Sequence, residues 1–123
     1  VICHFDWIPL PGNVVEATES LIRAHNPAWR TFGGSGIYPQ WAVDAGSAGF
    51  RDLEIFAYDH AQTISHEAWR GRIRASAGVG ASLAPEAVAR FDAELAEVLR
   101  ARFPEEPLSV PHRVFALVGR RPA

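Results

Sequence analysis

Three apolar runs, separated by segments with helical signals, most strongly constrain how this 123-residue chain can fold. The runs cover residues 1–5, 53–60 and 113–119, and each has the length of a β-strand. Two segments with helix start and stop signals lie between each pair of runs. The order strand, two helices, strand, two helices, strand is typical of an α/β domain, and the length favours one domain.

The composition of the runs indicates where each strand lies in its sheet. Residues 1–5 (VICHF) are apolar on both faces, which predicts an interior strand of a sheet covered on both sides. Residues 113–119 (RVFALVG) share this property and predict a central strand. The first connection contains helices and predicts a right-handed crossover between parallel strands. Because a bare core strand needs partners, we expect residues 1–123 to be part of a larger sheet, or residues 1–5 to pair with another chain.

The helices of the connecting segments begin at recognisable residues. Asn13 and Ser65 are suited to N-caps, and Pro39 and Pro85 are suited to the first helical turn. We expect helices over residues 14–25, 39–49, 66–77 and 85–103. The segment of about 65–103 leaves the sheet at the carboxyl end of the second strand, so it is predicted to be a helical lid insertion.

The composition excludes several classes of protein. The chain is 48% hydrophobic and 21% charged with a net charge of -2, an ordinary globular profile without the basic excess of nucleic-acid binding. No apolar run is long enough to span a membrane. The single cysteine, Cys3, allows no intrachain disulfide and fits a cytoplasmic location. With no HExxH motif and no paired cysteines, we expect no metal site.

A ligand site is expected beyond the carboxyl ends of the parallel strands, where open α/β sheets bind their ligands. The first strand delivers His4, Asp6 and Trp7 to this edge, and the second delivers Tyr58, Asp59 and His60. Histidine is a candidate general base at neutral pH, but histidines at strand ends also serve as structural hydrogen-bonding groups. The catalytic residues therefore stay unassigned.

The helix expected over 66–77 carries the most unusual local pattern. His66, Arg70 and Arg74 are spaced by four residues and share one face, next to Trp69. Two arginines beside a tryptophan suit a carboxylate or another planar anion, which a guanidinium binds through two parallel hydrogen bonds. The alternative is that both arginines pair with the chain's own Asp and Glu residues. The predicted substrate-binding residues are His4, Asp6, Trp7, His66, Trp69, Arg70 and Arg74.

Four segments, in this order, resemble one known family. VICHFDWIPLPGNVVEATESLIRAHNPAW is similar to the segment after the "GG" turn of class I S-adenosylmethionine-dependent methyltransferases, in a bacterial subgroup described only by that activity. AGF followed by DLEIFAYD resembles the sixth strand of that family, and SHEAWRGRIRASAGVGASL resembles a lid segment. PHRVFALVGRR resembles the last strand. The resemblance covers essentially the whole chain.

The resemblance implies a partial Rossmann-like fold. The family sheet has seven strands in the order 3-2-1-4-5-7-6, so this chain would supply a three-stranded mixed sheet of strands five, seven and six. The seventh strand would run antiparallel between the other two and place Pro111, His112 and Arg113 at the ligand edge. The family's glycine-rich turn and its ribose-binding acid have no counterpart in residues 1–123. We therefore assign no cofactor-binding residue.

On this interpretation the chain is the substrate-side half of an enzyme that is inactive by itself. The full-length protein would use S-adenosyl-L-methionine to methylate a small-molecule acceptor, which the arginines suggest to be anionic. Its partner would be the missing N-terminal half or, in a homodimer, a second copy. The alternative is a non-catalytic α/β module that binds a small anion or dimerises through an open strand edge. A hydrolase is disfavoured because no G-x-S-x-G motif is present.

Overall fold

The computed structural model describes residues 1–121, and it contains an element at each of the seven expected places. β2 and β3 extend beyond their apolar runs at both ends, and β1 extends beyond its run at the C-terminal end only. The helix boundaries agree with the sequence to within a few residues. The elements are β1 (Ile2–Trp7), α1 (Val14–His25), α2 (Pro39–Ser47), β2 (Arg51–Ile64), α3 (His66–Arg74), α4 (Pro85–Arg102) and β3 (Leu108–Arg120).

The three strands form one sheet in the order β1-β3-β2. β3 is central, as its two-sided apolar pattern indicated, and it runs antiparallel to both neighbours. β1 and β2 therefore run in the same direction without sharing a ladder. The expectation of a mixed sheet is wrong for this part of the chain, because β3 separates the only two strands that run parallel. The assignment of these strands to positions five, seven and six of a methyltransferase sheet stays a prediction.

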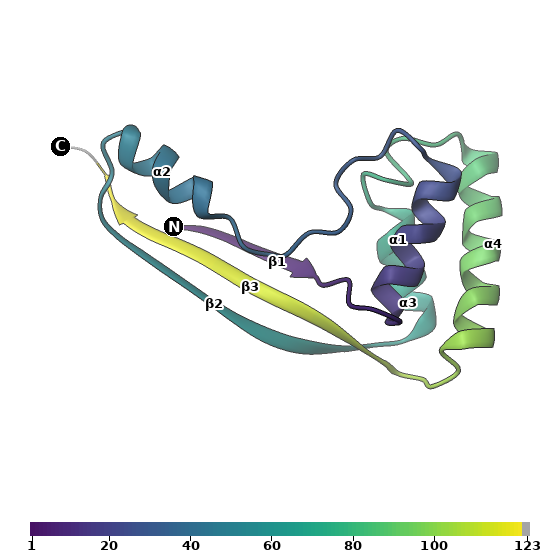
Figure 1. Ribbon diagram of the computed structural model, residues 1–123. Coiled ribbons are helices and arrows are strands. Elements are labelled where there is room, and N and C mark those ends of the chain that lie inside the picture. Colours follow the sequence, from purple (N-terminus) through teal and green to yellow (C-terminus); the bar gives the residue numbers. More distant parts are fainter. Residues whose placement is uncertain (122–123) are drawn as a thin grey trace.

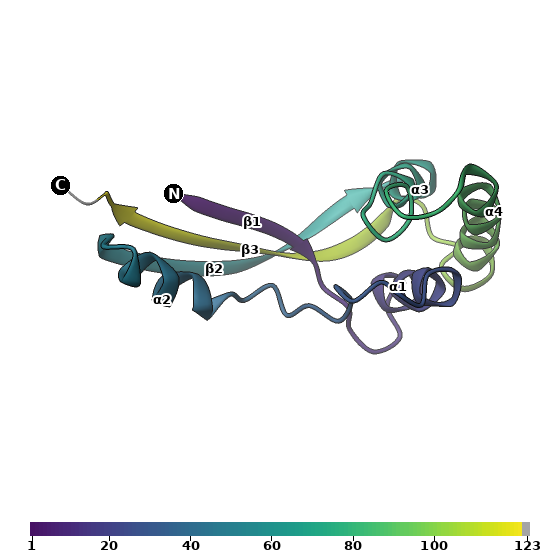
Figure 2. The same cartoon turned by 90° about the horizontal axis from the view of Figure 1, so that it is seen from above.

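β1 is an edge strand, which corrects the expectation that residues 1–5 are buried on both sides. Within residues 1–121 its outer edge has no strand partner, and Ile2 and Phe5 are 50% and 42% exposed. Figures 1 and 2 show α2 at one end of the sheet and α1, α3 and α4 grouped at the other. We call the side of the sheet that bears Phe5, Phe56 and Tyr58 the open face, because all three rings are exposed there.

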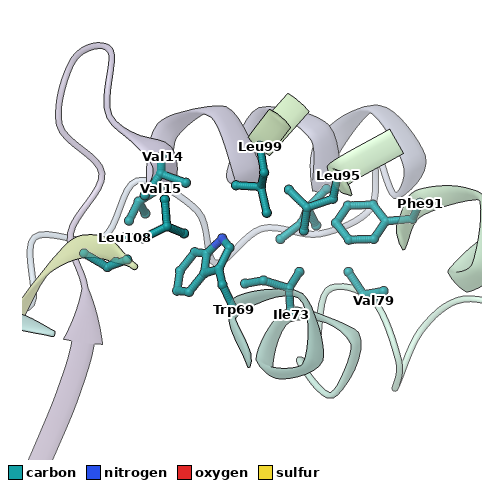
Figure 3. Close-up of a cluster of buried hydrophobic side chains, with 11 residues drawn as sticks. Val14, Val15, Trp69, Ile73, Val79, Phe91, Leu95, Leu99 and Leu108 are labelled. Carbon is teal, nitrogen blue, oxygen red and sulfur yellow. The ribbon is translucent and has the colours of Figure 1, made fainter. Parts of the chain in front are cut away.

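The main hydrophobic core lies among α1, α3 and α4 at the carboxyl ends of β1 and β2. Trp69 is completely buried near its middle (Figure 3), and its indole Nε1 donates a hydrogen bond to Thr18 Oγ1 at 3.1 Å. The segment 65–103 thus shares its core with α1 and is anchored at this edge of the sheet. The buried core residues are Val14, Val15, Ile22, Trp69, Ile73, Val79, Phe91, Leu95, Leu99, Leu108 and Val110.

The helix caps form as the sequence predicted. Asn13 Oδ1 accepts a hydrogen bond from the Glu16 amide at 2.9 Å, and the Glu16 carboxylate accepts one from the Gly12 amide at 2.6 Å. Ser65 Oγ accepts a hydrogen bond from the Ala68 amide at 3.1 Å. These bonds satisfy amides that a helix N-terminus leaves without a backbone partner, and they fix where α1 and α3 leave the sheet.

Candidate functional site

The carboxyl end of β1 places its side chains on opposite faces of the sheet. Trp7 pairs with His112, which also pairs with His60, and these three side chains form a row on the open face. Asp6 pairs with Arg113, one residue further along, so its side chain lies on the other face. The residues that the sequence assigned to one ligand edge are therefore divided between two surfaces.

On the Asp6 side, a tyrosine from the loop before α2 closes over the strand. The Tyr38 hydroxyl donates a hydrogen bond to Asp6 Oδ2 and lies 3.2 Å from His4 Nδ1. His4 Nδ1 lies 2.8 Å from Asp6 Oδ1, and the Tyr38 ring stacks on Trp41 with 4.4 Å between ring centroids. Burial, together with the hydrogen bond and the charge of Asp6, raises the pKa of Tyr38 to about 12. At neutral pH this phenol is a hydrogen-bond donor rather than a base.

Arg113, beside Asp6, makes three hydrogen bonds to its neighbours. Its guanidinium donates to both carboxylate oxygens of Asp59, at 2.6 and 2.9 Å, and its Nη1 donates to the Ser35 carbonyl at 2.9 Å. The hydrogen bond from Arg113 lowers the pKa of Asp59. The loop approaches closely at Gly36, whose φ is +68° and where a Cβ would lie 3.0 Å from Arg113 Cβ.

On the open face, Arg72 of α3 lies over His112. Arg72 Nη1 is 2.6 Å from His112 Nε2, and His112 Nδ1 is 2.9 Å from the Val110 carbonyl. A carbonyl can only accept, so Nδ1 carries the proton and the Nε2 lone pair accepts from Arg72. His112 is fully buried, and this burial lowers its pKa, to which the Arg72 charge adds. The imidazole is therefore neutral at pH 7.

Aromatic rings surround the Arg72 guanidinium. Its Cζ lies 5.0 Å from the Trp7 ring centroid and 5.9 Å from that of Trp69. Trp7 is fixed by a hydrogen bond of 3.0 Å from its Nε1 to Glu19 Oε1. Phe5 stacks on His112 with 4.5 Å between centroids. Burial lowers the pKa of Arg72, but an arginine stays charged at any physiological pH.

Arg70 and Arg74 point to the other side of α3, where they bind acids of the same chain. Asp92 of α4 accepts hydrogen bonds from Arg70 Nε at 3.0 Å, from Arg70 Nη2 and from Arg74 Nη1 at 2.8 Å. Glu67 accepts from Arg70 Nη1 at 2.9 Å and from Arg74 Nη2 at 2.8 Å. Internal ion pairing, the alternative that the sequence left open, is the arrangement observed.

His66 has a structural environment as well. Its Nε2 lies 3.0 Å from the Phe103 carbonyl and 3.1 Å from the Glu105 carbonyl, so it closes the C-terminal end of α4. Its backbone amide donates to Glu106 Oε1 at 2.9 Å. His66 and Arg70 line one cleft of about 360 Å³. The substrate-binding role predicted for His66 stays a prediction.

The structure thus places six of the seven predicted site residues in three groups, while the seventh, His66, lies at the C-terminal end of α4. His4 and Asp6 meet under Tyr38, Trp7 meets Trp69 edge-to-face at 5.5 Å between centroids, and Arg70 with Arg74 forms the α3–α4 ion-pair cluster. Arg72 is the residue that the sequence analysis missed. Its signal was its position three residues after Trp69, which places a charged side chain beside the buried stripe of α3.

A sizeable cleft lies away from this edge of the sheet. It has a volume of about 600 Å³ between α2 and the opposite end of the sheet, and its apolar lining includes Ile2, Trp41 and Leu53; among residues 1–121, Asp44 is the one ionisable side chain in the lining. A site for chemistry needs several convergent polar groups, which this cleft lacks. Over residues 1–121, no group of three or more His, Cys, Asp or Glu side chains is placed to hold a metal ion.

Comparison with known proteins gives no relative. The chain matches no known protein family, no curated protein and no solved structure. Any assignment of function therefore depends on the chain's own residues and geometry. Among the described residues, no helix combines the length and apolar character needed to cross a membrane.

Proposed function

We propose that this chain is the acceptor-side part of a class I S-adenosylmethionine-dependent methyltransferase. The observation that carries the proposal is the position of β3, which lies between β1 and β2 and runs antiparallel to both. The resemblance assigns β1, β3 and β2 to strands five, seven and six of the family. It requires the last strand, β3, to lie between the other two and to run in the opposite direction. The helical crossover between β1 and β2 and the four similar segments, in the same order, support the same assignment.

The uncovered parts of the sheet support the proposal independently. β1 has an open outer edge, and the open face exposes Phe5, Phe56 and Tyr58, which are 42%, 51% and 56% exposed. Natural proteins rarely leave a long apolar edge and face uncovered, because both promote aggregation. A donor-binding half with further parallel strands would pair with β1 and remove its open edge.

The described residues do not fit the methyl donor. At the start of α1, the Glu16 amide is already bonded to Asn13, and the Gly12 amide just before the helix is bonded to the Glu16 carboxylate, which would also repel an anionic group. The glycine-rich loop before α2 donates its Gly33 amide to Glu19 Oε2 at 2.8 Å. We therefore derive no step through the donor. What this chain would contribute is the acceptor site, where methyl transfer depends largely on positioning and exclusion of water.

The test compares the 123-residue chain with the complete gene product that contains it. Titration calorimetry should show binding of S-adenosylmethionine to the complete product and none to the chain, which lacks a donor site. Release of S-adenosylhomocysteine in the presence of small carboxylic acids would then identify the acceptor. A complete product that folds but does not bind the donor would remove the methyltransferase assignment.

The open edge of β1 favours one second candidate, a non-catalytic module that dimerises by pairing its β1 strands. Sedimentation equilibrium of the isolated chain distinguishes the candidates. A dimer that persists at micromolar concentration, with no donor binding by the gene product, would support edge pairing. A monomer would exclude it.

A further inference from the structure

Arg72 differs from the other partly buried arginines in having no acidic partner. Arg70, Arg74 and Arg113 are each bound by Asp or Glu side chains at hydrogen-bonding distance. Over residues 1–121, Arg72 forms no ion pair, and its one side-chain hydrogen bond goes to a neutral ring, that of His112. The charge of Asp6 acts on Arg72 from beyond ion-pair distance, and a half-buried cation without a direct acidic partner can gain from an anion that binds it.

The remaining donors of Arg72 are accessible. A guanidinium has five N–H groups, and the contact with His112 uses one of them. Among the described residues, the only buried side-chain polar atom without a hydrogen-bond partner is Ser76 Oγ. The unused nitrogens of Arg72 therefore keep some exposure to solvent.

The guanidinium is also held in place before any ligand arrives. The Val110 carbonyl fixes the His112 tautomer whose Nε2 accepts from Arg72 at 2.6 Å. Trp7 lies beside the guanidinium and is itself fixed by Glu19. A donor group oriented in advance loses less entropy on binding than a free surface arginine does. Phe5, stacked on His112 and still 42% exposed, provides an apolar wall beside this position.

We propose that Arg72 binds the carboxylate of a small aromatic or similarly planar acid through two parallel hydrogen bonds, with the ring of the acid against Phe5. The planar fork of arginine matches a carboxylate, and the edge formed by Nε and Nη2 is not used by the contact with His112. Within the proposed methyltransferase this acid is the acceptor, and to that extent the inference depends on the proposed function. Binding of the acid itself requires only the residues described here.

Benzoate is a suitable probe because it combines a carboxylate with one aromatic ring. It is titrated into the ¹⁵N-labelled chain while the indole N–H resonances of the tryptophans and the Arg72 Nε–H are followed by NMR. We expect saturable shifts of the Trp7 indole and the Arg72 Nε–H. Benzamide, the neutral analogue of nearly the same shape, should bind at least about tenfold more weakly, since it lacks the charge. Equal affinity of the unaltered chain for the two compounds would overturn the proposal.

Substitutions then locate the site. Arg72→Gln should weaken benzoate binding about tenfold or more, and Arg72→Lys, which keeps the charge but loses the fork, should weaken it by a smaller factor. Arg90→Gln, which removes an exposed arginine on α4, is the matched control and should leave the affinity unchanged. No saturable shift in the unaltered chain, or an Arg72→Gln variant that binds as the unaltered chain does, would refute the assignment. Donor binding and S-adenosylhomocysteine release are separate measurements, so failure of the methyltransferase proposal can be distinguished from failure of this one.

Discussion

Replacing Asp92 with Asn tests whether Arg70 and Arg74 serve the fold. Asp92 lies between α3 and α4 with its side chain 17% exposed, and it accepts three hydrogen bonds from the two arginines. Burial opposes its ionisation, but the hydrogen bonds from Arg70 and Arg74 outweigh this and lower its pKa. The Asp92→Asn substitution removes the charge and keeps the size of the side chain.

The expected loss of stability follows from this geometry. A hydrogen bond to a charged group contributes about 1.5–3 kcal/mol. Three such bonds would suggest a larger loss of stability. However, an asparagine oxygen still accepts one hydrogen bond, and Glu67 still binds both arginines. We therefore expect Asp92→Asn to lower the free energy of unfolding by about 2 kcal/mol. The control is Glu97→Gln, which breaks an exposed i,i+3 pair with Arg100 and should cost about 0.5 kcal/mol or less.

The assay is urea unfolding followed by tryptophan fluorescence, repeated over a range of pH. Because folding lowers the pKa of Asp92, its stabilising contribution is complete above the unfolded carboxyl pKa of about 3.9. The contribution is lost as the pH falls through the lower pKa of the folded state. The difference between the parent and Asp92→Asn should thus be constant near neutrality and shrink below about pH 4. A cost no larger than that of Glu97→Gln, or one independent of pH, would refute this account of the arginines.

Three further predictions concern separate parts of the molecule. Gly80→Ala should destabilise the fold by about 2–3 kcal/mol, because the new Cβ would lie 2.1 Å from the backbone oxygen of Arg74 in α3. In the same urea assay Gly34→Ala should be nearly neutral, because its Cβ would have no atom within 4 Å. An alkaline absorbance titration should show Tyr38 ionising with a pKa of about 12, and Asp6→Asn should lower this pKa toward 10 without reaching it, since burial remains. Asn13→Ala should cost about 1 kcal/mol by removing the N-cap of α1, measured by thermal unfolding followed by circular dichroism.

The sequence was most informative where local chemistry decides the structure. Asn13 and Ser65 cap the helices that they were expected to cap, and prolines 39 and 85 lie in the first turns of α2 and α4. The two-sided apolar pattern of residues 113–119 indicated a central strand, which β3 is. The same pattern in residues 1–5 could not show that β1 lies at an edge, because an apolar run does not reveal whether its partners belong to the same chain.

The candidate site was less predictable because it depends on contacts between distant residues. The spacing of Arg70 and Arg74 on one helix face was correct, but Asp92, which lies 22 residues from Arg70, determines what that face contacts. Asp6 and Trp7 are neighbours in sequence and point to opposite faces, because side chains alternate along a strand. The prediction of one shared ligand edge did not take this alternation into account. Arg72 became conspicuous only once the carboxylate partners of the other arginines were known.

The unequal placement of the core has a consequence for motion. α2 contributes no fully buried residue, and β2 has none along its whole length, whereas the opposite end of β3 enters the main core at Leu108 and Val110. Backbone amides near Val110 should exchange with deuterium slowly, and the amide of Arg120, beyond the buried Leu117, should exchange much faster, because opening there breaks few buried contacts. The end of the β2–β3 ribbon beside α2 would then open many times for each opening of the end beside α1, α3 and α4. A partner that binds the α2 end would therefore be detected first as slower amide exchange at that end.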